Sequence, residues 1–174
     1  MSLQIYNPHD AIFKKFFSDI EVARTFVKSY LDPDLQQKCN LTSLKIEPGS
    51  FVEEELSQQH SDILYSLKID GIKGYVYINV EHQSSPNKLM PFRMLRYKLA
   101  IMKQHLDQGH KKLPTVISIL FYHGKKGPYP YSLSLIECFE DPDFARQHFL
   151  NDAILVDLSQ ISDETFEKHH KRVS

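Results

Sequence analysis

The sequence predicts an α/β fold in which helices flank a mixed sheet. Three observations lead to this fold class. Helical patterns come first, and three strand-like segments follow between residues 41 and 83. A helix then spans about Pro91 to Asp107, and Thr115–Tyr122 is a continuous apolar run typical of a strand. Because a helix separates the third and fourth strands, a parallel crossover connection is expected between them.

Length and composition indicate one ordinary globular domain over residues 1–174. The chain has 174 residues, of which 41% are hydrophobic and 25% charged. No apolar run approaches the roughly 18 residues that cross a bilayer, and the N-terminus lacks the layout of a signal peptide. Cys39 and Cys138 belong to no pair motif, so we expect free thiols and a cytoplasmic protein without membrane contact. The net charge of −1 neither indicates nor excludes nucleic-acid binding.

The N-terminal segments predict helices. Asn7 can cap a first helix with Pro8 in its first turn, and Ser18–Glu21 reads as a capping box that starts a second. Asp32-Pro33 ends the second helix, and Leu35–Cys39 fits one further helical turn. The apolar face of the second helix comprises Ile20, Ala23, Phe26, Val27 and Tyr30.

Three strands are expected next. Leu41–Ile46 is the first, and Phe51–Gln59 fits either a continuation of that strand or a short helix. His60–Ile69 and Tyr75–Gln83 alternate in polarity around a turn at Asp70–Gly74, which predicts an antiparallel hairpin. Side chains alternate between the two faces of a strand. We therefore expect Glu81 and Gln83 to share one face and, with Asp62 of the preceding strand, to form one site.

The second half of the chain continues the alternation of elements. The expected core face of the 91–107 helix comprises Phe92, Leu95, Leu99, Met102 and Leu106. Thr115–Tyr122 fits a strand buried on both faces. We expect a helix over Pro142–Leu150, a short strand over Ala153–Leu158 and a last helix capped by Ser162, whereas residues 132–139 are ambiguous. The chain ends within helical-looking sequence, so we expect it to be the N-terminal part of a longer protein.

Two carboxylates on paired strands suit phosphodiester hydrolysis. That reaction needs a divalent cation to polarise the phosphate and an activated water molecule. Mg²⁺ prefers oxygen ligands and often takes only one or two carboxylates, which Asp62 and Glu81 can supply. The side chain of Gln83, two residues after the glutamate on the same face, can position the water.

Several motifs together resemble a known family. They are His9–Lys14, Ser61–Tyr65, Glu81–Ser85, Phe92–Tyr97 and Leu120–Gly124. The chain resembles the Rpn family of recombination-promoting nucleases, also described as YhgA-like putative transposases, within the PD-(D/E)XK nuclease superfamily. The resemblance covers about residues 7–172. It implies a PD-(D/E)XK core of order α-β-β-β-α-β and a bacterial, Mg²⁺-dependent DNA endonuclease that promotes recombination, with Ca²⁺ or Mn²⁺ as alternative cations.

Carried over by position, the resemblance makes Asp62 and Glu81 metal ligands and places Gln83 where most of the superfamily has lysine. Glutamine carries no charge, although it can still orient a water molecule. Ser61 replaces the usual proline before the first acid, which affects only backbone shape. Arg93, Arg96 and Lys98, on the helix after Glu81, are the expected contacts to the DNA backbone, or alternatively a solvated helix face. Lysines at 111, 112, 125 and 126 would add a basic rim.

Four further residues are candidates for supporting the site. Asp10 either approaches the cation or acts as a favourable carboxylate at a helix N-terminus. Glu54 belongs to an acidic run that is otherwise solvated. His82 faces away from Glu81 and fits the core or a supporting position. His123 ends the fourth strand and is either near the site or structural.

Two rival functions stay open at this point. The first is a catalytically inactive DNA-binding or interaction module on the same fold, with Gln83 marking the lost activity. The second is a transposase that joins strands as well as cutting them. If one chain holds one site, cutting both strands favours a homodimer.

Overall fold

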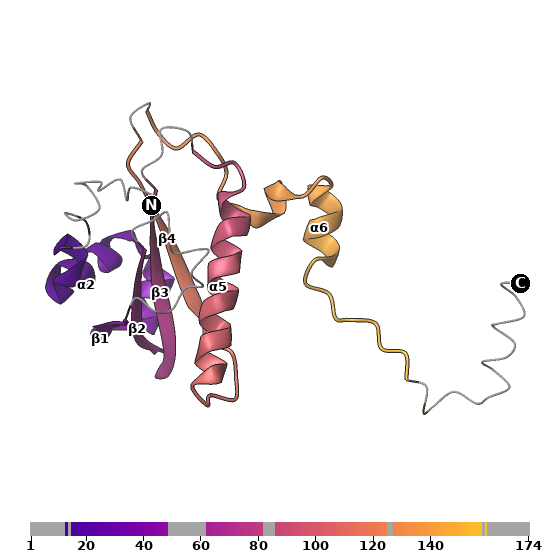
Figure 1. Ribbon diagram of the computed structural model, residues 1–174, viewed down its shortest axis with the longest axis horizontal. Coiled ribbons are helices and arrows are strands. Elements are labelled where there is room, and N and C mark those ends of the chain that lie inside the picture. Colours follow the sequence, from indigo (N-terminus) through magenta and orange to yellow (C-terminus); the bar gives the residue numbers. More distant parts are fainter. Residues whose placement is uncertain are drawn as a thin grey trace, which may run out of the picture. The chain divides into compact units, whose positions relative to one another are not determined.

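A computed structural model describes residues 13, 15–48, 62–81, 86–124, 127–157 and 159 (Figure 1). The chain divides into two compact units, residues 1–138 and residues 139–174. The expected cap at Asn7, the uncertain segment 51–59 and the last helix at Ser162 lie outside the described residues. Within the described part, no helix is long and apolar enough to cross a membrane.

Two helices precede the sheet in the first unit. Helix α2 spans Ile20–Tyr30, and helix α3 spans Pro33–Lys38. The cap of α2 is Asp19 rather than the expected Ser18, because the Asp19 carboxylate accepts the backbone N–H groups at the first turn whereas the Ser18 hydroxyl donates backwards to a carbonyl. Asp32 caps α3 in the same way, so the expected helical turn is real but begins at Pro33.

A four-stranded mixed sheet forms the centre of the first unit. Its strands are β1 (Cys39–Ile46), β2 (Ile63–Ile69), β3 (Ile72–Glu81) and β4 (Val116–Tyr122), in that spatial order. The β1–β2 and β2–β3 pairs are antiparallel, and β3–β4 is parallel. Helix α5 (Met90–Asp107) makes the crossover between β3 and β4, as the sequence predicts.

The hairpin turn between β2 and β3 is shorter than expected. Ile69 pairs with Ile72, so the turn consists of Asp70 and Gly71 instead of the predicted Asp70–Gly74. Both turn residues have positive φ, 48° and 80°, which matches the type of two-residue turn that suits the twist of a hairpin. The short turn fixes which residues of the two strands lie opposite each other.

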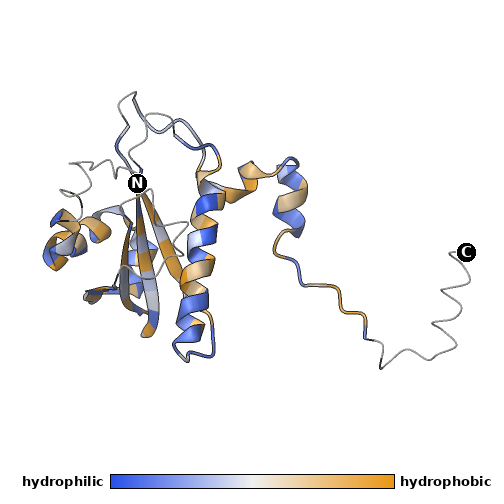
Figure 2. Cartoon of the chain, in the orientation of Figure 1, coloured by the Kyte–Doolittle hydropathy of each residue, from blue (hydrophilic) through white to orange (hydrophobic). Residues whose placement is uncertain are grey.

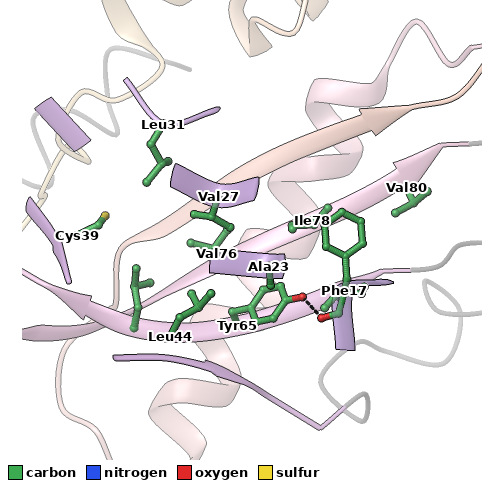
Figure 3. Close-up of a cluster of buried hydrophobic side chains, with 12 residues drawn as sticks. Phe17, Ala23, Val27, Leu31, Cys39, Leu44, Tyr65, Val76, Ile78 and Val80 are labelled. Carbon is green, nitrogen blue, oxygen red and sulfur yellow. Dashed lines mark hydrogen bonds between the residues drawn. The ribbon is translucent and has the colours of Figure 1, made fainter. Parts of the chain in front are cut away.

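Helix α2 covers one face of the sheet with an apolar core (Figure 3). The core includes Phe17, Ala23 and Val27 before and within α2, and inward-facing residues of β2 and β3. The strand residues are Ile63, Tyr65, Leu67, Val76, Ile78 and Val80. The Tyr65 hydroxyl donates to the backbone carbonyl of Phe17, which satisfies its buried polar group. The predicted alternation of both strands is confirmed on this face.

Helix α5 covers the opposite face, but with a different side than the sequence predicts. Its buried residues are Met90, Pro91, Met94, Tyr97, Ile101 and His105. Tyr97 and Ile101 pack on Tyr75, Tyr77 and Leu64 of the sheet. Three residues of the predicted core face are instead exposed, namely Phe92, Leu99 and Leu106. Helix α5 carries both hydrophobic and hydrophilic residues along its length (Figure 2). Hydrophobicity alone therefore selects the wrong side of α5 as the one that faces the sheet.

The C-terminal predictions are partly wrong. Strand β4 lies at an edge of the sheet, and only Val116 is buried, so the expected burial on both faces is wrong. Leu135–Cys138 forms a 3₁₀ helix where the sequence is ambiguous, and helix α6 spans Pro142–His148 in the second unit. Residues 153–157 form no strand, and their apolar side chains are exposed. The two cysteines are free, as expected.

Candidate active site

The α5-facing side of strand β3 changes from aromatic to polar along its length. Tyr75 and Tyr77 come first, and Asn79 and Glu81 follow, all fully buried. Successive side chains of a strand point to opposite faces, so these four residues share one face. The Asn79 amide and the Glu81 carboxylate are thus buried at the end of the strand, where the sequence changes from apolar to polar residues. Amide and carboxylate groups are costly to bury without hydrogen-bond or ionic partners, so Asn79 and Glu81 need such partners around them.

Asp62 lies beside this polar end of β3. The register pairs Ile63 with Ile78, so Asp62, one residue earlier, is opposite Asn79. The Asn79 side-chain amide donates to Asp62 Oδ1 at 2.8 Å and reaches the Tyr77 hydroxyl at 3.3 Å. Glu81, two residues beyond Asn79, is then the diagonal neighbour of Asp62, a position typically about 7–8 Å away. The fold therefore brings both predicted acids to the face that also carries Asn79.

Helix α5 covers the polar cluster with Arg93 and Tyr97. One guanidinium nitrogen of Arg93, Nη1, lies 3.8 Å from Glu81 Oε2. The other two, Nε and Nη2, donate to the Tyr97 hydroxyl at 3.2 and 3.0 Å. The Tyr97 ring packs against Tyr77 with 5.0 Å between centroids. Arg93 and Tyr97 are four residues apart on a helix, which places both side chains on the face toward the sheet.

Burial controls the ionisation of the site. It raises the pKa of Asp62 from 3.8 to about 6, although interactions with Tyr77, Arg93 and Asn79 pull that pKa back toward its usual value. Burial also raises the pKa of Tyr77, and the nearby Asp62 carboxylate raises it further. The pKa of Tyr97 is raised by burial and lowered in part by Arg93. Asp62 is consequently ionised at neutral pH, whereas both tyrosines stay protonated and can donate hydrogen bonds.

The available oxygens fit a hard divalent cation. Among the described residues, Asp62 Oδ2 and Asn79 Oδ1 are buried without a hydrogen-bond partner. No group of three or more acidic, histidine or cysteine side chains gathers in this described part. Two carboxylates with a neighbouring amide oxygen suit Mg²⁺, which commonly keeps several waters and takes few protein ligands. The assignment of Asp62 and Glu81 as ligands stays a prediction.

The other predicted site residues fall into two groups. Gln83, His82, Asp10 and Glu54 lie outside the described residues. Among the described ones, the exposed His123 follows β4, and its backbone N–H donates to the Glu81 carbonyl at 3.0 Å. This hydrogen bond ties the backbone just after β4 to the backbone of Glu81 in the predicted site.

The three basic residues predicted on α5 differ in environment. Arg96 is exposed, Lys98 is partly buried, and the Arg93 side chain is only 18% exposed and faces Glu81. The sequence predicts one group of three cations on the helix surface. The fold separates Arg93 from the other two.

Sequence reasoning also missed three residues of the cluster: Tyr77, Asn79 and Tyr97. Two of them were detectable, because Tyr77 and Asn79 share the predicted strand face of Glu81. Tyr97 was not, because its burial depends on which side of α5 meets the sheet.

Comparison with protein families gives one match over nearly the whole chain. The family described as "Putative transposase, YhgA-like" matches residues 7–173. The match includes both strands of the hairpin, helix α5 and β4, so it covers every element that builds the polar cluster.

Individual relatives come from Escherichia coli K12. The chain is 42% identical over 168 residues to "Recombination-promoting nuclease RpnA", which is 97% of this chain and 58% of that protein. It is 42% identical over 164 residues to "Recombination-promoting nuclease RpnC", which is 94% of this chain and 55% of that protein. It is also 42% identical over 165 residues to "Inactive recombination-promoting nuclease-like protein RpnE", or 95% of this chain and 55% of that one. The chain thus spans little more than half the length of these relatives, and no solved structure matches it significantly.

Proposed function

Because the chain belongs to the family of YhgA-like putative transposases, we propose that it is a divalent-cation-dependent DNA endonuclease that promotes recombination. Two relatives that cover almost the whole chain carry the name of recombination-promoting nuclease. The observation that supports a hydrolytic site is the placement of the partly buried Asp62 beside the fully buried Asn79 and Glu81, on one face of a hairpin under Arg93. A PD-(D/E)XK core accounts for this arrangement and for the α-β-β-β-α-β order.

In the proposed reaction, a water oxygen bonds to phosphorus and the bond between phosphorus and one ester oxygen breaks. The water gives up one proton, and the leaving oxygen ends as a hydroxyl group. A divalent cation at the site supplies polarisation of a phosphate oxygen and a lower pKa for nearby water. Asp62 and Glu81 would hold Mg²⁺, or Ca²⁺ or Mn²⁺ in its place, and Gln83 would orient the attacking water. Asn79 holds the Asp62 carboxylate in place through its 2.8 Å hydrogen bond.

DNA would bind on the solvent-exposed side of the site that contains Asp62 and Glu81. Arg96 and Lys98 are the proposed contacts to the phosphate backbone, and the exposed Lys111 and Lys112 would extend a basic rim. A DNA substrate implies action in the bacterial cytoplasm. Cleavage of both strands would require two sites, so we propose a homodimer for that outcome.

The test is a plasmid nicking and linearisation assay with Mg²⁺, with EDTA as the metal-free control. Asp62→Asn and Glu81→Gln keep the shape of each side chain and remove its charge, and both are expected to abolish cleavage. Asp107→Asn is a matched control, because Asp107 is an exposed carboxylate that pairs with Lys103 on the outside of α5. Cleavage by both site variants at the wild-type rate would refute the proposed site.

An inactive DNA-binding module is the second candidate, because the named inactive relative RpnE has the same 42% identity as RpnA. Binding of duplex DNA without cleavage under any divalent cation would favour it. A transposase would in addition join a labelled DNA end to a target strand, and a strand-transfer assay separates this activity from plain cleavage.

A further inference from the structure

Arg93 differs from Arg96 and Lys98 of α5 because its guanidinium group faces the buried Glu81. Its side chain is only 18% exposed, and Nη1 lies 3.8 Å from an oxygen of the fully buried Glu81. Within the described part of the chain, Arg93 thus brings a positive charge to Glu81, one of the two predicted acids.

Tyr97 fixes the orientation of the guanidinium group. Nε and Nη2 both donate to the Tyr97 hydroxyl, at 3.2 and 3.0 Å, and Tyr97 is itself fully buried against Tyr77. A guanidinium group presents its donors in a rigid planar fork. With one edge of that fork held by Tyr97, the Nη1 edge is directed toward the Glu81 carboxylate.

Phosphodiester hydrolysis requires such a charge. Negative charge grows on the phosphate oxygens as water adds to phosphorus, and fixed positive groups in a buried site stabilise that charge most effectively. Gln83, two residues after Glu81 in the sequence, is neutral and cannot supply it. An arginine can bind two oxygens of a phosphate at once.

We propose that Arg93 is a catalytic residue that stabilises the developing charge on the phosphate, and that Tyr97 is a positioning residue that holds Arg93. This inference rests on the proposed nuclease function. It reassigns Arg93 from the group of general DNA-backbone contacts to the reacting phosphate. Helix α5 thereby contributes to the reaction, in addition to covering the sheet.

A purely structural role is the alternative, in which Arg93 only compensates the buried charge of Glu81. Removal of one partner of a buried ion pair destabilises a protein, so a loss of activity alone does not distinguish the roles. The two roles differ in what they predict for folded protein. A structural arginine affects stability, whereas a catalytic one affects kcat even when the variant is fully folded.

The experiment measures kcat and KM on a labelled DNA duplex with saturating Mg²⁺ for Arg93→Met, Arg93→Lys and Tyr97→Phe. Thermal unfolding in EDTA verifies folding, and fluorescence anisotropy in EDTA reports duplex binding independently of turnover. Arg93→Met should lower kcat by about 10²–10³-fold, as for loss of one stabilising donor in other active sites. Its duplex Kd should change by less than tenfold. Arg93→Lys should recover part of kcat, and Tyr97→Phe should lower kcat about tenfold, since the charge is kept but loses its anchor.

Lys103→Met is the matched control on the same helix. Lys103 is 73% exposed and pairs with Asp107, so its loss should leave kcat unchanged. The proposal is overturned if folded Arg93→Met keeps kcat within twofold of the wild type. It is also overturned if the factor by which kcat falls is no larger than the factor by which the duplex Kd rises. Should Arg93→Met fail to fold, wild-type kcat in both Arg93→Lys and Tyr97→Phe overturns the proposal instead. Inactive Asp62→Asn with normal Arg93→Met would refute only the role of Arg93, whereas normal cleavage by Asp62→Asn would refute the proposed function itself.

Discussion

The two faces of the sheet are built from the same strands, yet they differ in what they bury. The face toward α2 carries Val76, Ile78 and Val80 of β3, which pack only with other apolar groups. The face toward α5 carries Tyr77, Asn79 and Glu81, which make hydrogen bonds and an ion pair. Successive residues of β3 thus belong alternately to an apolar core and to a polar cluster. The larger apolar cluster lies on the face toward α2, whereas the face toward α5 also holds charged groups that are costly to bury without partners.

The largest expected effect tests the apolar face. Phe17→Ala should lower the free energy of unfolding by about 3–5 kcal/mol, because Phe17 is fully buried and its loss leaves a cavity. Urea denaturation measures this change. Phe16→Ala is the matched control, since the neighbouring Phe16 is 49% exposed and its truncation should cost much less. Equal losses for the two variants would contradict the division between the faces, as would a change in kcat of folded Phe17→Ala.

The part of the fold that follows from periodicity was predictable. The period of two in β2 and β3 assigned their faces correctly, because one residue of slippage would expose a whole apolar set. Helix α5 has two competing apolar stripes, and its sequence favours the one with Phe92, Leu99 and Leu106, which is exposed in the structure. The stripe that meets the sheet contains Tyr97 and Ile101, which pack on Tyr75, Tyr77 and Leu64 of the strands. Helical periodicity cannot identify this match, since it depends on another element.

The site was predictable in its acids but not in its geometry. Asp62 lies opposite Asn79 only because the hairpin turn has two residues, Asp70 and Gly71. A turn over Asp70–Gly74, as the sequence suggested, would start pairing three residues later on β3. That odd shift would place Asp62 opposite the other face of the strand. The inward direction of Arg93 likewise depends on the tertiary contact of α5 and leaves no pattern in the sequence.

The second prediction concerns the energetic cost of the polar face. The pKa of Asp62 is raised from 3.8 in the unfolded chain to about 6 in the folded protein, so the folded state binds its proton more tightly. Stability from this group is therefore full below about pH 4 and is lost as pH rises through about 6, a change of about 3 kcal/mol. Asp62→Asn cannot ionise and should avoid this loss.

The measurement is the free energy of unfolding of wild type and Asp62→Asn between pH 4 and pH 7.5, in EDTA. The variant should gain about 3 kcal/mol relative to the wild type between pH 4 and pH 7 while losing cleavage activity. Asp107→Asn provides the control, because Asp107 is exposed on α5 and should show no such gain. A constant difference between wild type and Asp62→Asn across this range would mean that Asp62 ionises as readily in the folded protein as in the unfolded one.

The smallest expected effect compares two buried tyrosines, one on each face. Tyr65→Phe removes the hydrogen bond to the Phe17 carbonyl and should lower the free energy of unfolding by about 1–2 kcal/mol, without changing the pKa of Asp62. Tyr77→Phe removes a hydroxyl group that favours the ionised form of Asp62, so that pKa should rise further above 6. NMR titration of the Asp62 carboxyl carbon measures both outcomes without relying on cleavage. If Tyr65→Phe moves the pKa of Asp62 as far as Tyr77→Phe does, the sheet does not insulate its two faces, and the polar cluster is sensitive to packing throughout the unit.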